Sequence, residues 1–514
     1  MNEEPLLGLE ETDGLDPTGA VLNLTQRTVH GLFWTYASIA VTVVLQVGYT
    51  AVISRRLSPA DFGLVAFAGL PLALSGFFAD MGISSAVVQK PGLDDRDVRV
   101  AFTGSVAIGL LVSAAIILAS PAIGVLFGNP EVVPILRVLA LSFAITGFGS
   151  VALGLLRRQM KFRQIAIIEV TSYTVAYPLV GLLLAWRGAG VWSLVGAALT
   201  QTVTMVCLSY ALARHAARPL LDGQRAKRIL GFGGLVSVTG VLEFLGANAD
   251  TFAVGRFIGT ESLGQYSRAN LVIGLPMSHL ATGATKVLLP GFAQLEGDDA
   301  RAKRAFLPGL ALFASLMFPI AAVLGALAEP LVRVLLGDQW RETALVLPIV
   351  GGAVAFGFVQ HLPAVLCEAR GRLRQKILIQ SAYLIFVVVL VGLVVERGPT
   401  VRTLATVFLV GQAVQEVLYL GYVKRDLSLS ASDLLMIHIE AFLLAGAAAG
   451  GARVVSTMLS SPLLALLAGG LSGIAIWVAA MLLLKGLRAR RAIDHLDLRS
   501  LPRWLPRRSP PGDS

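Results

Sequence analysis

The chain has 514 residues, of which 55% are hydrophobic and only 14% are charged, and its mean hydropathy is +0.74. A soluble domain has about 25% charged residues, so this composition excludes one large soluble core. The apolar residues form blocks of roughly 20, the length of a helix that crosses a bilayer, and they lack the alternation of a β-barrel. The sequence therefore predicts an all-α polytopic membrane protein. Its formal net charge of +10 then reflects membrane topology and not a nucleic-acid partner.

About fourteen membrane-spanning helices are expected along the chain, separated by short loops. Their expected limits are residues 31–54, 62–81, 100–120, 132–156, 165–186, 191–211, 229–254, 262–289, 306–327, 343–367, 377–395, 404–421, 433–454 and 462–484. Residues 1–28 are polar and acidic and lack the basic start of a signal peptide, so we expect a disordered cytoplasmic tail there. Residues 486–514 are expected to form a basic cytoplasmic tail. No loop is long enough for an extramembrane catalytic domain, and we therefore do not expect an enzyme.

Lysine and arginine are distributed unequally between alternate loops. One set of loops carries 21 of these residues, and the other set carries 10. Cytoplasmic loops of membrane proteins are the ones enriched in lysine and arginine. Both termini are therefore expected in the cytoplasm, which agrees with an even number of spans.

Two stretches of the sequence suggest an internal repeat. Residues 53–68 align without gaps with residues 254–269, and Gly63 matches Gly264. Six predicted spans separate equivalent positions, so the two copies would share their orientation. A parallel repeat is typical of carriers with two six-helix lobes around a central cavity. The expected division is an N-terminal lobe at residues 29–215, a C-terminal lobe at residues 216–425 and two additional helices at residues 426–485.

Seven sequence stretches carry a family resemblance. They are SRRLSPADFGLVAFA from Ser54, DMGISSAVVQ from Asp80, LLRRQMKFRQIAIIE from Leu155, GAGVWSLV from Gly188, NADTFAVGRFIGTESLGQYSRA from Asn248, LPGFAQLEGDDARAKRAF from Leu289 and AEPLVRVLLGDQW from Ala328. In this order they resemble the Wzx-type oligosaccharide flippases of the multidrug/oligosaccharidyl-lipid/polysaccharide superfamily, and most closely its lipopolysaccharide and colanic-acid exporter-like branch. Many relatives read more like GYYS-A at Gly264, where this chain has Gln265 and Arg268.

The resemblance implies transport of an undecaprenyl-pyrophosphate-linked oligosaccharide from the cytoplasmic to the outer leaflet of a bacterial inner membrane, for lipopolysaccharide or exopolysaccharide biosynthesis. Membrane lipids would be direct partners, and a polysaccharide polymerase and export machinery are further candidates; no cofactor is implied. The alternative within the same superfamily is an ion-coupled antiporter of small molecules or drugs, for which an acidic cavity is expected. The sequence does not name the glycan, the coupling ion or the oligomeric state.

A row of basic residues crosses the eighth predicted span. Arg268, His279 and Lys286 fall within about 20° of one another on a helix. A charge in a membrane usually faces a cavity or a partner, and this row would suit a pyrophosphate. Alternatively, Arg268 and Lys286 lie near opposite ends of the span and reach the two interfaces.

Carboxylates inside predicted spans are candidates for ion coupling. Glu243 and Asp250 lie seven residues apart on one face of the seventh span, and Glu416 lies in the twelfth. A carboxylate in a low-dielectric cavity can take up and release a proton near neutral pH. The open alternative is that Glu243 and Asp250 form structural pairs with Arg268 or Arg256.

Further polar residues are candidates for the substrate cavity, namely Gln46, Tyr49, Asn248 and Glu169. Sugar recognition would need several of them to converge on one cavity. Alternatively, each of them simply joins helices through interhelical hydrogen bonds. His361 and Glu368 have no third ligand at motif spacing, so we expect no metal site.

Overall fold

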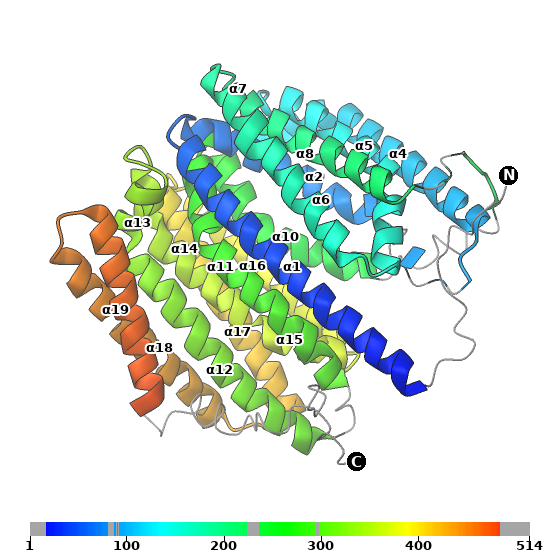
Figure 1. The fold of residues 1–514 in the computed structure, drawn as a ribbon. Helices are drawn as coiled ribbons and strands as arrows, with labels where there is room; N and C mark the ends of the chain where they lie inside the picture. The colour runs from blue at the N-terminus through cyan, green and yellow to red at the C-terminus, as the bar shows by residue number, and fades with distance from the viewer. Residues whose placement is uncertain are drawn as a thin grey trace, which may run out of the picture. The chain divides into compact units, whose positions relative to one another are not determined.

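The computed structural model describes residues 17–80, 87–88, 90, 92–214, 216, 218–223, 236–293 and 298–483, and within them the side chains of all but residues 17–29, 77–80, 236–239 and 279–293. Every regular element in this part of the chain is helical, which confirms the all-α class (Figure 1). The tail expected at residues 486–514 lies outside the described residues, and so do residues 1–16 of the tail expected at residues 1–28. Residues 17–28 are described and are helical, so the expected disordered tail does not extend over them.

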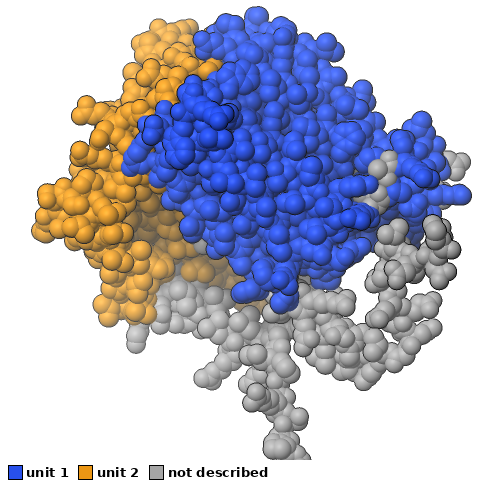
Figure 2. Space-filling model, turned by 45° about the horizontal axis from the view of Figure 1, so that its top comes forward, with its two compact units in different colours: residues 1–56, 71–237 blue, residues 57–70, 238–514 orange. Residues whose placement is uncertain are grey.

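The described chain forms two compact units, which Figure 2 colours separately. Unit 1 comprises residues 1–56 and 71–237, and unit 2 comprises residues 57–70 and 238–514. Unit 1 contains α1 (Pro17–Ile53), the second half of α2 (Pro59–Asp80), α4 (Asp95–Phe127), α5 (Val132–Arg158), α6 (Phe162–Thr174), the π-helix η1 (Val175–Gly181), α7 (Leu182–Trp186) and α8 (Trp192–Leu212).

Unit 2 begins with the first half of α2 and holds the remaining helices. These are α10 (Val236–Phe257), α11 (Thr260–Ala293), α12 (Asp299–Ala326), α13 (Ala328–Leu335), α14 (Arg341–Val359), α15 (His361–Ala369), α16 (Leu373–Val395), α17 (Val401–Asp426), α18 (Ala431–Thr457) and α19 (Pro462–Leu483). The division into two lobes and two additional helices stays a prediction.

Within the described residues, each of the fourteen expected spans coincides with one helix or with two or three helical elements in succession. Twelve helical segments among the described residues are long and apolar enough to cross a membrane. The other two expected spans correspond to α10 and α11, whose side chains are described only in part, and α10 carries Glu243, Asp250 and Arg256. The protein is thus a multi-pass membrane protein, and the count of fourteen spans stays a prediction.

Two of the expected spans are interrupted in the structure. The span at residues 165–186 contains the π-helix η1 around Pro178, because proline lacks the N–H group of a regular helical turn. The span at residues 343–367 is divided at Gln360 into α14 and α15, and Pro363 stands in the first turn of α15. The second break places Gln360 and His361 where they face a cavity in unit 2.

The last two helices pack closely on the rest of unit 2. α18 contacts both α12 and α19. A Cβ atom placed on Gly469 of α19 would lie 2.9 Å from the carbonyl oxygen of Ala452 on α18, so the two helices approach at small residues, as is common in membranes. Trp477 of α19 donates a hydrogen bond of 2.7 Å from Nε1 to the carbonyl oxygen of Ser315 on α12.

The two aligned stretches of the repeat contact each other inside unit 2. A Cβ atom on Gly63 of α2 would lie 1.8 Å from the carbonyl oxygen of Thr260, and one on Gly264 of α11 would lie 1.7 Å from that of Pro59. The alignment pairs Gly63 with Gly264 and Pro59 with Thr260, so the contact is reciprocal. No side chain fits between the two backbones, which explains glycine at both positions.

We predict that Gly63→Ala lowers the apparent melting temperature of the purified protein in detergent. The added methyl group would overlap with the carbonyl of Thr260, and overpacking of this kind costs about 1–3 kcal/mol. Gly69→Ala is the matched control in the same helix, because a Cβ atom there meets nothing within 4 Å. Equal melting temperatures for the two variants would contradict the reciprocal contact.

Candidate functional site

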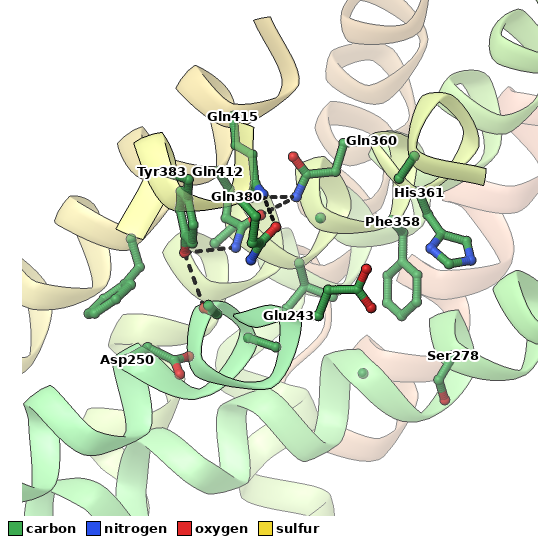
Figure 3. A pocket seen from close by; sticks show the side chains of 18 of the residues that line it. Glu243, Asp250, Ser278, Phe358, Gln360, His361, Gln380, Tyr383, Gln412 and Gln415 are labelled. Carbon is green, nitrogen blue, oxygen red and sulfur yellow. Dashed lines mark hydrogen bonds between the residues drawn. The ribbon is translucent and has the colours of Figure 1, made fainter. Parts of the chain in front are cut away.

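Unit 2 encloses a cavity of about 880 Å³. Its wall is formed by α10, α11, α14, α15, α16 and α17, with Gln360 between α14 and α15 (Figure 3). The ionisable and amide side chains that line it are Glu243, Asp250, Asn270, Gln360, His361, Glu368, Lys376, Gln380, Gln412 and Gln415. Charged and amide side chains thus gather in one cavity whose lining is otherwise mostly apolar.

Four glutamines and a tyrosine form one hydrogen-bonded network along the cavity wall (Figure 3). The Nε2 atom of Gln360 donates to the Oε1 atoms of Gln412 and Gln415. Gln415 donates to Gln380 at 2.7 Å, and Gln412 donates to the hydroxyl of Tyr383 at 3.0 Å. The Oε1 atom of Gln360 is buried and has no hydrogen-bond partner among the described residues, so it can accept a hydrogen bond from a ligand or water.

The network reaches α10 at a glycine. The hydroxyl of Tyr383 donates to the carbonyl oxygen of Gly246 at 3.4 Å. A Cβ atom on Gly246 would lie 2.1 Å from the Nε2 atom of Gln380. The absence of a side chain at this position therefore lets the amide of Gln380 lie against the helix backbone.

A lysine joins three helices at the cavity wall. The ammonium group of Lys376 on α16 forms ion pairs with the Oε1 atoms of Glu243 on α10 and Glu368 on α15. The partner of Glu243 is therefore Lys376, and not Arg268 or Arg256 as the sequence analysis considered.

Asp250 is surrounded by neutral hydrogen-bond donors. Its carboxylate accepts from the backbone N–H of Thr251 at 2.6 Å, from the hydroxyl of Tyr266 at 2.9 Å and from the amide of Asn270 at 3.4 Å. Each of these donors stabilises the carboxylate by a hydrogen bond and none supplies a positive charge. Asp250 therefore has no ion pair among the described residues, whereas Glu243 and Glu368 in the same wall pair with Lys376.

Of the cationic row expected in α11, the structure describes only the side chain of Arg268. The guanidinium group of Arg268 lies 4.5 Å above the ring of Phe62, and that ring packs edge-on against Trp340. Arg268 does not line the cavity. The side chains of His279 and Lys286 lie outside the described residues, so the row as a whole stays a prediction.

The remaining candidates are not among the residues that line this cavity. In unit 1, Glu169 accepts a hydrogen bond of 3.2 Å from the hydroxyl of Ser38, and Tyr49 packs edge-on against Tyr177. Gln46 is half-buried in the same unit. In unit 2, the amide of Asn248 donates to the carbonyl oxygen of Phe244 at 2.9 Å, within its own helix.

Glu416 also lies outside the cavity and is only 2% exposed. Its Oε1 atom lies 2.7 Å from the Nε2 atom of His438 on α18, whose Nδ1 atom lies 2.8 Å from the carbonyl oxygen of Leu434. A carbonyl oxygen only accepts, so Nδ1 carries a hydrogen. The contact with Glu416 then needs a second proton, on Nε2 or on the carboxyl group. The pair therefore shares a proton and connects α17 to α18.

Some functional candidates were missed by sequence reasoning. Lys376 was counted among the loop cations, and Gln360, Gln380, Tyr383 and Gln415 were not singled out. In the part of the chain that the structure describes, no three or more His, Cys, Asp or Glu side chains lie close enough together to hold a metal ion.

We predict that His438→Leu destabilises the protein and that Glu416→Leu combined with His438→Leu restores most of the loss. Removing one partner of a buried pair costs about 3–5 kcal/mol, whereas apolar replacement of both is often neutral. Apparent melting temperatures in detergent measure the effect. A double variant as unstable as the single one would show that the shared proton does not determine stability.

The chain is similar in sequence to a family of known proteins. The family model described as "Polysaccharide biosynthesis protein" matches residues 52–345. The succinoglycan biosynthesis transport protein ExoT of Rhizobium meliloti (strain 1021) is 28% identical over 318 residues, which are 62% of this chain and 64% of ExoT. The lipopolysaccharide biosynthesis protein WzxC of Escherichia coli (strain K12) is 23% identical over 64% of this chain and 67% of its own. The match thus spans about two thirds of these relatives.

Two solved structures share the fold at low sequence identity. An inward closed structure of the lipid II flippase MurJ aligns with a TM-score of 0.69 and 14% identity, covering 89% of this chain and 99% of the other. An inward-facing multidrug resistance MATE transporter of the MOP superfamily aligns with a TM-score of 0.56 and 18% identity, covering 74% and 94%. The helical architecture is therefore that of these transporters, and the chain belongs to the polysaccharide biosynthesis protein family whose model matches residues 52–345.

Proposed function

We propose that this protein carries an undecaprenyl-pyrophosphate-linked oligosaccharide from the cytoplasmic to the outer leaflet of a bacterial inner membrane by alternating access, for lipopolysaccharide or exopolysaccharide biosynthesis. The observation that carries the proposal is the cavity of about 880 Å³ in unit 2, together with the charged and amide side chains that line it. A hydrophilic glycan needs such a chamber because hydrocarbon offers its hydroxyl groups no hydrogen-bond partner. Both termini would lie in the cytoplasm, and the protein would perform no covalent chemistry.

The glutamine network gives the cavity the chemistry for a glycan. Each glutamine side chain has an acceptor oxygen and two donor hydrogens, so an array of four can exchange hydrogen bonds with sugar hydroxyl groups in many orientations. The volume is within the range of about 300–1,000 Å³ that ligand pockets have. The lipid tail would stay in the bilayer, where the outer faces of the helices are apolar.

The names of the relatives support a role in moving polysaccharide precursors. ExoT is named for succinoglycan, WzxC for lipopolysaccharide and TuaB of Bacillus subtilis (strain 168) for teichuronic acid. The solved MurJ structure is that of a lipid II flippase. Because these polymers differ, the names support a role in polysaccharide biosynthesis and do not select one glycan. A polymerase and export machinery would act on the product.

Asp250 is the most suitable ion-coupling group in the proposed cycle. Its carboxylate lines the cavity and meets only neutral donors among the described residues, so a proton or a cation can neutralise it. Glu243 and Glu416 are candidates too, but each already has a basic partner, Lys376 and His438 respectively.

A second candidate function is an ion-coupled small-molecule or drug antiporter. The observation that favours it is the charge of the cavity wall, which carries the carboxylates of Glu243, Asp250 and Glu368 against the single ammonium of Lys376. An acidic wall suits cationic drugs. Drug susceptibility of a deletion strain separates the two functions, because only the antiporter predicts a change.

A reconstituted translocation assay tests the proposed function. The purified protein is placed in vesicles that carry a fluorescent lipid-linked oligosaccharide in both leaflets, and a membrane-impermeant quencher reports the fraction exposed outside. We expect protein-dependent movement of the lipid-linked glycan between leaflets. Vesicles with protein that behave like empty vesicles would refute the flippase.

We predict that Asp250→Asn lowers the translocation rate at least about tenfold, the effect of losing an interaction of about 1.4 kcal/mol. The amide keeps the size of the side chain but cannot take up a proton. Asp338→Asn is the control, since Asp338 is exposed and pairs with Arg333 outside the cavity. A variant that keeps both its rate and its response to an imposed proton gradient would exclude Asp250 from coupling.

A further inference from the structure

We infer that Lys376 is an exchangeable oxyanion site, in which Glu243 and Glu368 are counterions that a negatively charged group of the cargo replaces. The ligand chemistry is a phosphate-type or carboxylate oxyanion, as in a pyrophosphate ester or an acidic sugar. The inference rests on the proposed function, because it names a group that would hold the headgroup or glycan in the cavity of unit 2.

The three side chains come from separate helices and meet at the cavity wall. Lys376 lies in the first turns of α16, Glu243 on α10 and Glu368 near the end of α15, and all three line the cavity. The ammonium group of Lys376 contacts one oxygen of each carboxylate. A single cation thus joins the consecutive helices α15 and α16 to α10, which lies more than a hundred positions earlier in the chain.

The burial of the three groups is unequal, and this makes exchange feasible. The side chain of Lys376 is only 8% exposed, whereas those of Glu243 and Glu368 are 44% and 36% exposed. A buried ammonium ion is strongly destabilised without a counter-charge. A half-exposed carboxylate can leave Lys376 for water while the other carboxylate still neutralises the buried ammonium, so the exchange of one glutamate costs less than the loss of both. The lysine therefore always needs an anion, but neither glutamate is firmly held.

The hydrogen-bond capacity of lysine allows a stepwise replacement. An ammonium group has three donor hydrogens, and the two glutamates engage two of them. An incoming oxyanion can bind the third hydrogen before a carboxylate leaves, so the charge of Lys376 is never unpaired. Among the described residues that line the cavity, Lys376 is the only lysine or arginine. An oxyanion that enters the cavity would therefore bind at this ammonium group.

The exchange makes a counterintuitive prediction. If the glutamates compete with the ligand, removing the charge of one should strengthen oxyanion binding, although both line the same cavity. If they only stabilise the fold, the same change should weaken binding or leave it unaltered. The sign of the effect therefore separates a competing counterion from a structural one.

The test is binding of inorganic pyrophosphate and, in a second arm, of glucuronate to the full-length protein in detergent, measured by titration calorimetry. We expect Glu368→Gln to bind at least one ligand about fivefold more tightly, the equivalent of about 1 kcal/mol. We expect Lys376→Met to bind it at least about tenfold more weakly, because charge-assisted hydrogen bonds are lost, and Lys376→Arg to retain binding. Lys303→Met is the control, since Lys303 is outside the cavity and contacts the carbonyl oxygen of Ser428.

The outcomes are distinct. The expected pattern with pyrophosphate assigns the site to a phosphate group, and the same pattern with glucuronate alone assigns it to an acidic sugar. Unchanged or weaker binding by Glu368→Gln, which keeps the lysine, overturns the inference, as does binding of neither ligand by the unmodified protein. If the pattern holds while the translocation assay fails, the oxyanion site stands and the flippase function does not.

Discussion

The structure of unit 2 depends on one constraint, which is that polar groups placed among membrane helices must satisfy one another. An unpaired polar group in hydrocarbon costs several kcal/mol. Here the amides of Gln360, Gln380 and Gln415 join in one network, and Lys376 neutralises two carboxylates. These polar groups face a common cavity, and they supply the hydrogen-bonding groups of a wall that is otherwise mostly apolar. The packing of six helices and the capacity to hold a hydrophilic cargo thus have the same origin.

Most of the fold could be predicted because the apolar blocks match the thickness of a bilayer, and every expected span coincides with helical structure. What hydropathy could not predict were the interruptions. Prolines occur in several of these helices. Among the described residues, however, only η1 at Pro178 departs from the α-helix within its span, and only at Gln360 is a span divided by a turn. Whether a proline is absorbed or breaks a membrane helix depends on which neighbouring groups satisfy the freed carbonyl, and these come from distant parts of the chain.

The site was predicted only in part. Glu243 and Asp250 were identified because a charge in an apolar block stands out, and both line the cavity. Lys376 was assigned to a loop because it follows a cluster of arginines at the start of its span. A helical stripe was the available signal, since Lys376, Gln380 and Tyr383 recur at intervals of four and three residues on α16. Glu368 lies only eight positions before Lys376, across the turn between α15 and α16. The contact with Glu243 could not be foreseen, because no local pattern reports a contact between residues more than a hundred positions apart.

The charge of the chamber shapes the chemistry of the proposed carrier. The described wall is acidic with one embedded cation, so recognition of a neutral glycan by amides and of an anionic group by a lysine would operate side by side. The central claim is that a hydrophilic glycan occupies this chamber, and chemical protection of its wall tests this most directly. Gly274 lines the cavity with open space around its Cβ position. In a Cys207→Ser background, Gly274→Cys should react with a membrane-impermeant thiol reagent, and lipid-linked oligosaccharide should slow that reaction. A thiol that never reacts, or that reacts at the same rate with and without the glycan, would contradict the account.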